Sequence, residues 1–271
     1  AASARMENDG RGHCRRRECR CGKAAECEAV CAGCLNAGGE CLSGVTRPSV
    51  TIPYLTSAPV IDAVPDEAAW ESVEWMPFAH RFGRMKPVED KCLVKLGWNY
   101  RGIFAAVQSS DEEIRAREVP RDGPVWEGDC FEIFLDPQDR GYSYYEIAIN
   151  PEGSFYDYLI VPRKSGWNPA RSPRWTCEGF EFRTSRDDGG WRLEAFIPFN
   201  ALATALHVPP GEDRPWRGHA GVMDRDRGSF RAPDIFPVTG AHHPESFGLI
   251  AFDRTALKAQ EAADDVASRS L

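Results

Sequence analysis

The chain has 271 residues, of which 42% are hydrophobic and 11% aromatic, and its formal net charge is -8. This size suits one sizeable core, and the acidic charge argues against nucleic acid as the main partner, because phosphate binding needs a basic face. No run of about 18 apolar residues occurs, so the sequence predicts no membrane span.

Residues 1–48 form a separate, cysteine-rich N-terminal segment. Apolar periodicity is almost absent before Val50, and residues 44–48 are the expected linker. Three interpretations stay open: a disulfide framework in an oxidising compartment, a zinc site that uses Cys31 and Cys34, or a leader outside the mature chain. Seven of the ten cysteines lie in this segment: Cys14, Cys19, Cys21, Cys27, Cys31, Cys34 and Cys41. The other three, Cys92, Cys130 and Cys177, are expected to be plain buried thiols.

Residues 49–254 read as one strand after another, with prolines and glycines between short apolar runs. Two short helices are expected, at 66–72 and at 200–206, the second capped by Asn200. Residues 255–271 form a polar tail, expected to be a helix or a frayed end. The predicted strands cover 92–98, 103–108, 129–136, 143–149, 154–161, 175–184, 191–197, 219–224 and 246–252. This pattern predicts an all-β, antiparallel, jelly-roll-like β-sandwich with one or two short helices.

The segment from Trp126 to Asp136 carries the most specific pattern. Phe131 lies on one face of its strand and Glu132 on the other, because side chains alternate with period 2. A flat aromatic ring beside a carboxylate suits a sugar, whose C–H faces stack on rings and whose hydroxyls need fixed hydrogen-bond partners. The alternative is a buried tryptophan next to a glutamate on a solvated sheet face.

Six segments, in order along the chain, resemble motifs of family 9 carbohydrate-binding modules and their DOMON-like relatives. They are Val60 to Trp70, Leu96 to Val107, Trp126 to Asp136, Glu146 to Gly153, Gly190 to Phe199 and His243 to Phe252. The resemblance implies a β-sandwich and a non-catalytic, sugar-binding role. It also implies that Trp126 is one wall of the site, that Glu132 bonds hydroxyls, and that Asn150 contributes after the next strand. Turn capping before Pro151 is the alternative for Asn150.

Two departures from the family pattern affect the expected site. A basic residue that contacts sugar is replaced by Ala148, and the second aromatic wall is replaced by the run Gly240 to His243. His242 or His243 could take the place of that wall. If the two central strands pair, Glu146 shares the face that carries Glu132. The candidate ligand-binding residues are Trp126, Glu132, Glu146, Asn150 and His243.

The sequence therefore predicts a secreted, periplasmic or cell-surface module that holds a mono- or oligosaccharide, or the end of a polysaccharide chain. A glycoside hydrolase is a possible partner, no cofactor is required, and calcium is considered at the acidic turns 136–139 and 187–188. Alternatives are a structural or adhesion domain without sugar binding, a glycoside hydrolase component that uses Glu132 with Glu146 or Asp129, and a haem-binding DOMON-like domain.

Overall fold

The computed structural model describes residues 47–78, 92–111, 113–161, 175–225 and 241–268, together with the backbone of short strands at 80–81, 84–87, 170–172 and 233–234. The described residues belong to one unit that begins at Arg47. The cysteine-rich segment falls almost entirely outside them, at residues 1–46. Within the described part, no helix is long and apolar enough to cross a membrane.

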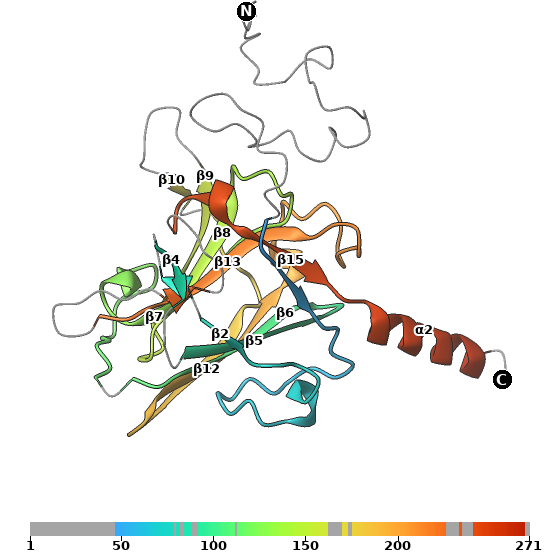
Figure 1. The fold of residues 1–271 in the computed structure, drawn as a ribbon, viewed down its shortest axis with the longest axis horizontal. Helices are drawn as coiled ribbons and strands as arrows, with labels where there is room; N and C mark the ends of the chain where they lie inside the picture. Colours follow the sequence, from blue (N-terminus) through green and yellow to red (C-terminus); the bar gives the residue numbers. More distant parts are fainter. Residues whose placement is uncertain are drawn as a thin grey trace, which may run out of the picture. The chain divides into compact units, whose positions relative to one another are not determined.

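The strands form two sheets that pack face to face (Figure 1). The larger has the order β10-β9-β8-β7-β13-β14-β3-β4, with β15 paired to β13 and β1 to β15; the smaller has the order β11-β12-β6-β5-β2. In the larger sheet lie β1 (Ser49–Ile52), β3 (His80–Arg81), β4 (Arg84–Pro87), β7 (Cys130–Asp136), β8 (Tyr144–Ile149), β9 (Phe155–Val161), β10 (Ala170–Ser172), β13 (Trp216–Met223), β14 (Pro233–Asp234) and β15 (Gly248–Phe252). In the smaller lie β2 (Met76–Pro77), β5 (Cys92–Asn99), β6 (Gly102–Ser109), β11 (Glu181–Asp187) and β12 (Gly190–Pro198).

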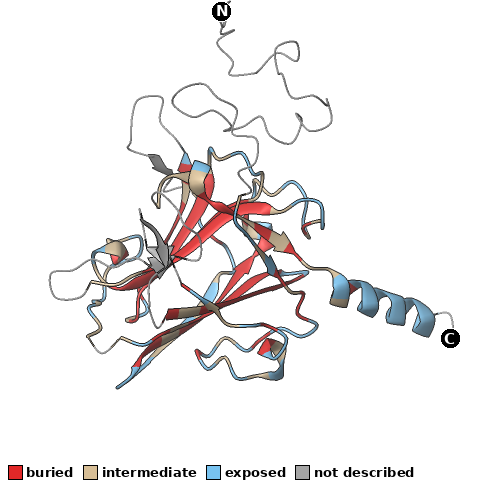
Figure 2. Cartoon of the chain, in the orientation of Figure 1, coloured by how far each residue is buried: buried red, intermediate tan, exposed pale blue. Residues whose placement is uncertain are grey.

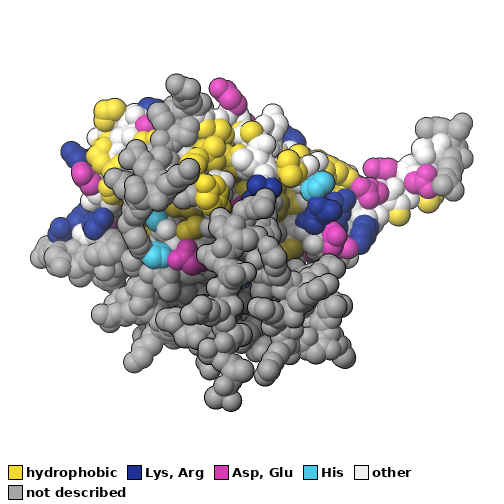
Figure 3. Space-filling model, turned by 90° about the horizontal axis from the view of Figure 1, so that it is seen from above, with side chains coloured by type: hydrophobic (Ala, Val, Ile, Leu, Met, Phe, Trp, Pro, Cys, Tyr) yellow, Lys and Arg dark blue, Asp and Glu magenta, His cyan; other side chains and the backbone are white. Residues whose placement is uncertain are grey.

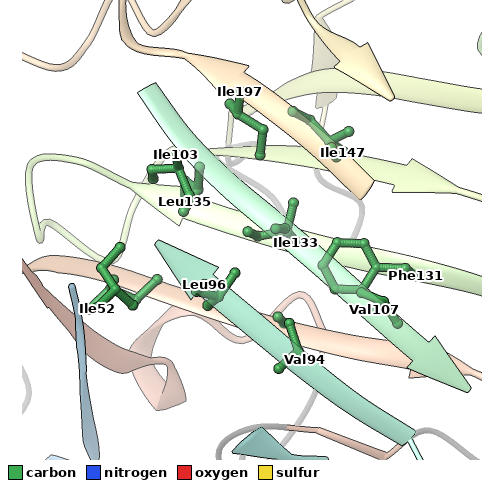
Figure 4. Close-up of a cluster of buried hydrophobic side chains, with 14 of the residues drawn as sticks. Ile52, Val94, Leu96, Ile103, Val107, Phe131, Ile133, Leu135, Ile147 and Ile197 are labelled. Carbon is green, nitrogen blue, oxygen red and sulfur yellow. The ribbon is translucent and has the colours of Figure 1, made fainter. Parts of the chain in front are cut away.

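This architecture confirms the predicted β-sandwich. The named strands pair antiparallel, except that β1 runs parallel to β15. The core lies between the sheets, where the inward-facing side chains of strands such as β5, β6, β7 and β12 are buried. Burial follows both sheets along their length, whereas the C-terminal helix is exposed (Figure 2). Figure 4 shows core side chains from facing strands in contact, among them Val94, Leu96, Ile103, Val107, Phe131, Ile133, Leu135, Ile147 and Ile197.

Some local predictions are confirmed and others need correction. The three cysteines expected to be buried thiols are buried, and a 3-10 helix, η1 (Ala68–Trp70), lies inside the first predicted helix. The second predicted helix shrinks to one 3-10 turn, η3 (Phe199–Ala201), with Pro198 rather than Asn200 at its N-cap. Beyond that turn the backbone of Thr204 bonds to Tyr145 of β8 and to Gln138 in the turn after β7. These bonds replace the i to i−4 ladder that a longer helix would need.

The outer face of the larger sheet is also buried. Glu132 of β7 points away from the core between the sheets, yet only 5% of it is exposed. A second apolar cluster covers this face, and it includes Val125 and Phe247 from loops and Tyr156 from β9. The alternative of a glutamate on a solvated sheet face is therefore wrong, because this carboxylate lies inside the molecule.

A buried glutamate joins the first loop of the domain to β12. Glu194 is fully buried, and it accepts hydrogen bonds from Trp70 Nε1 at 2.7 Å, Ala63 N at 2.9 Å and Asp62 N at 3.1 Å. Burial raises the pKa of Glu194, while these donors oppose the rise. Two motifs that are far apart in the sequence, 60–70 and 190–199, thus meet at one carboxylate.

The tail predicted to be a polar helix is α2 (Thr255–Ser268). Its first turns dock through buried Leu257 and through Tyr100, whose hydroxyl donates to Glu261 at 2.5 Å. The rest of α2 projects from the sandwich and carries acidic side chains on its surface (Figures 1 and 3).

We predict that deletion of residues 1–46 leaves a cooperative thermal melt, because the described unit has its own core. Deletion of residues 1–52 is the matched comparison. It also removes β1, whose Ile52 is 1% exposed and pairs with Phe252. Scanning calorimetry should therefore show a lower melting temperature for the longer deletion only. Loss of the cooperative transition in the shorter deletion would contradict the prediction.

Candidate functional site

The candidate site lies where β7, β8 and β9 run side by side. Strand pairing sets Glu132 opposite Ala148 and Ala148 opposite Tyr156, so the three residues form one row across the sheet. Glu146 lies two residues before Ala148 on β8 and is a diagonal neighbour of Glu132. The period-2 alternation places all four on the face away from the main core. The predicted sharing of a face by Glu132 and Glu146 is confirmed.

Tyr156 links the two carboxylates. Its hydroxyl lies 2.6 Å from Glu146 Oε1 and 3.2 Å from Glu132 Oε1. It reaches Glu132 over Ala148, whose methyl group leaves room that a longer side chain would fill. A hydroxyl has one proton, so Tyr156 donates to only one carboxylate at a time. Burial, followed by the two nearby glutamates, raises the pKa of Tyr156 well above its usual value.

Glu146 retains hydrogen-bonding capacity. The residue is 1% exposed, and its Oε2 atom has no hydrogen-bond partner in the described part of the chain. The Nδ1 atom of His242 lies 4.0 Å from this Oε2 atom. A buried carboxylate oxygen without a donor is costly, so this atom is suited to accept a hydrogen bond from a bound molecule.

Trp126 is positioned by a 3-10 turn, η2 (Val125–Glu127), immediately before β7. The side chain is half-buried, and its ring packs edge-on against Tyr156 with the centroids 5.4 Å apart. The tryptophan thus contacts the tyrosine that bonds to both glutamates. Three of the predicted residues, Trp126, Glu132 and Glu146, are brought together with Tyr156, which the sequence analysis did not select.

Asn150 performs the alternative role considered for it, the capping of a turn. Its Oδ1 accepts hydrogen bonds from Glu152 N and Ser154 N, at 3.1 and 2.9 Å, and its Nδ2 donates to Arg117 O at 2.8 Å. Both lone pairs of the oxygen are therefore used within the protein. The side chain also lines a pocket of about 240 Å³ behind η2, together with Arg115, Arg117, Val119, Val125 and Glu127.

The histidine near the carboxylates is His242 rather than His243. The Nδ1 atom of His242 lies 2.8 Å from the hydroxyl of Tyr144, on the same face as Glu146. His243 instead contacts Glu245, with Nδ1 2.7 Å from Oε1. Neighbouring residues in an irregular segment point in different directions, and the sequence alone offered no period with which to choose between the two.

The acidic turns considered for calcium use their carboxylates internally. Asp136 accepts hydrogen bonds from Gln138 N and Gly141 N, and Asp139 is bonded to Arg217. In the other turn, Asp187 pairs with Arg192 and accepts from Gly189 N. These turns are a poor fit for a cation that needs several free oxygens. Carboxylate oxygens of Asp62, Glu67 and Glu194 do converge within 4.8 Å, so calcium binding stays a prediction.

The sequence matches the model of the carbohydrate family 9 binding domain-like family over residues 61–209. The chain belongs to this family. Modules of the family bind carbohydrate and are generally non-catalytic. The sandwich fold is also shared with solved structures. Residues on β7 and β8 therefore lie in the same framework as those of family 9 modules.

Two of these structures are family 9 modules from Caldicellulosiruptor kristjanssonii. One is in complex with glucose, with 19% identity, a TM-score of 0.55, and coverage of 76% of this chain and 96% of that one. The other is in complex with cellotriose, with 18% identity, a TM-score of 0.54, and coverage of 77% and 97%. A third, from Bacteroides uniformis, has 18% identity, a TM-score of 0.60, and coverage of 77% and 100%. No curated protein sequence matches the chain.

We predict that Tyr156→Phe lowers the free energy of unfolding by about 1–3 kcal/mol, because it removes a donor from buried carboxylates. Tyr158→Phe is a matched control. Tyr158 lies two residues along β9, and its hydroxyl donates to the carbonyl of Asp122, an exposed residue. We expect the control to cost less, because water can replace that donor. Equal losses in urea denaturation would show that the bonds from Tyr156 to the glutamates have no special weight.

Proposed function

We propose that this domain is a non-catalytic carbohydrate-binding module whose site comprises Trp126, Glu132 and Glu146. The observation that carries the proposal is the half-buried Trp126 packed against Tyr156, whose hydroxyl lies within hydrogen-bonding distance of both carboxylates on the outer face of β7 and β8. A sugar ring would lie on the tryptophan, and its hydroxyls would donate to the carboxylates. Glucose and cellotriose, which relatives bind, are the first ligands to test.

Affinity should be weak. Glu132 and Glu146 are 5% and 1% exposed, so the side chains that cover them must move before a sugar can reach them. A tryptophan that stacks a sugar on one side only contributes less than two opposing rings. We therefore expect a dissociation constant in the millimolar to high micromolar range, equivalent to about 4–6 kcal/mol.

A second candidate function is that of a structural or adhesion domain that has lost sugar binding. The same burial of Glu132 and Glu146 favours it, as does Ala148 at the position of a basic residue in the family pattern. The two functions differ in one measurement, which is heat of binding with sugars.

We further propose a secreted, periplasmic or cell-surface location and association with a glycoside hydrolase, as expected for a module whose role is to hold a glycan.

We predict that Trp126→Ala abolishes binding of cellotriose while the domain stays folded. A half-buried ring leaves a smaller cavity than a core tryptophan, whose truncation costs about 3–5 kcal/mol. Trp75→Ala is a matched control, because Trp75 is also half-buried but packs with Lys95 of the smaller sheet. Titration calorimetry should show binding for the wild type and the Trp75 variant only. Unaltered binding by the Trp126 variant would disprove the platform assignment.

We predict that Glu132→Gln weakens cellotriose binding by about 1–3 kcal/mol, because a neutral amide accepts a weaker hydrogen bond than a carboxylate. The size of the side chain is kept, so the thermal melt should change little. Glu152→Gln is the control, since Glu152 lies on the turn after β8 and bonds to Arg186. Titration calorimetry at one pH compares the cellotriose affinity of the wild type, Glu132→Gln and Glu152→Gln. Equal affinity of the two variants would remove Glu132 from the site.

A further inference from the structure

Asp129 connects the start of β7 to two other loops. It is 1% exposed, and its carboxylate accepts main-chain hydrogen bonds from Arg115 N and, at 2.6 Å, from Arg225 N. Arg115 belongs to the loop after β6, and Arg225 follows β13 closely. The backbone of Asp129 adds a third bond, from its N–H to Arg115 O at 2.8 Å. One buried side chain thus connects the start of β7 to the loop after β6 and to the segment after β13.

The same cluster reaches Trp126. The Nη2 atom of Arg225 donates to the carbonyl of Trp126 at 2.8 Å. Arg225, whose main-chain N–H bonds to Asp129, therefore also fixes the backbone of Trp126. On the other side, the loop that contains Arg115 supplies Arg117 O, the acceptor for Asn150. The position of the tryptophan therefore depends on two loops that meet at the Asp129 carboxylate.

We propose that Asp129 is a positioning residue for sugar binding: its ionised carboxylate holds the loops at Arg115 and Arg225 in place and thereby orients Trp126. The inference rests on the proposed function, because it concerns the same tryptophan. Asp129 touches no sugar in this scheme and acts only through Arg225 and the loop at Arg115.

The electrostatics around Asp129 give this role a signature in pH. Burial raises the pKa of Asp129 to about 6, the two main-chain N–H donors lower it, and Asp111 and Asp224 raise it. Among the described residues, the carboxylate oxygens of Asp111 and Asp224 lie within 4.8 Å of that of Asp129. Arg115 and Arg225 face it with their main-chain N–H groups, while their guanidinium groups bond to Glu113 and to the carbonyl of Trp126. N–H donors bond more strongly to a carboxylate than to a protonated acid, so the loops are held best above pH 6.

Stability and binding should therefore change in opposite directions with pH. The folded pKa is raised above the unfolded value of 3.8, so the contribution of Asp129 to stability is fully present below that value and is lost as pH rises through about 6. Sugar affinity should instead fall as pH drops through about 6, because protonation loosens the loops. A merely structural aspartate would change stability with pH and leave the sugar affinity of the folded domain unchanged.

The test measures cellotriose binding by calorimetry between pH 5 and 7.5, in chelator, for the wild type, Asp129→Asn and Asp136→Asn. Asp136 is the matched control: it lies at the other end of β7, is also 1% exposed and also accepts two main-chain bonds. We expect wild-type affinity to fall about fivefold or more toward pH 5, a size typical of coupling between sites. Asp129→Asn should bind weakly at every pH, and Asp136→Asn should follow the wild type.

Arg225→Met is a second variant in case Asp129→Asn does not fold. It keeps the main-chain bond to Asp129 and removes the bond to Trp126 O, so affinity at pH 7.5 should fall while the thermal melt is preserved. If the wild type binds no sugar, the proposed function fails. If the wild type binds sugar, an unchanged affinity and pH profile in Asp129→Asn overturns the positioning role alone. Where Asp129→Asn is unfolded, Arg225→Met takes its place in this comparison. Equal losses in Asp129→Asn and Asp136→Asn would also overturn it.

Discussion

The burial of both faces of β7 is the constraint on which the candidate site depends. The inner face packs into the core between the sheets, and the outer face packs under loops and aromatic side chains. Water does not solvate a charged side chain that is buried on the outer face, so each carboxylate there needs hydrogen-bond donors from the protein or from a ligand. Glu132 and Glu146 lie on this outer face. The donors that surround their carboxylates therefore indicate more about function than the spacing of the two residues in the sequence does.

The row Glu132, Ala148 and Tyr156 shows how a small residue changes such a face. Ala148 leaves room above β8, and the tyrosine from β9 crosses that room to reach Glu132. The donor in this row is a neutral hydroxyl with a raised pKa. A neutral hydroxyl is a weaker donor to a carboxylate than a cation is, so a sugar hydroxyl can match it in strength.

The sequence was sufficient to predict the sandwich, because strand alternation and turn residues are local properties. The shared face of Glu132 and Glu146 followed from the same period, once β7 and β8 were assumed to pair. Burial of the outer face could not be predicted, since it depends on loops such as the one that carries Phe247. For the same reason Tyr156 was missed, although the alternation in Phe155 to Tyr158 placed two tyrosines on one face. His242 and His243 differ only in backbone direction, which no pattern in the sequence specified.

Two buried glutamates in this domain differ in the number of donors that reach them, and the difference separates structure from function. Glu194 receives three hydrogen bonds on two oxygens, so each oxygen has a donor within the protein, and these bonds join the first loop to β12. Glu146 receives a bond from Tyr156 on one oxygen, while the other has no partner among the described residues. Both are almost fully buried, so exposure cannot distinguish them. An unfilled acceptor on a carboxylate that shares Tyr156 with a half-buried tryptophan ring is the combination that a polyhydroxylated ligand would complete. Glu194 has a donor on each oxygen and lacks this combination.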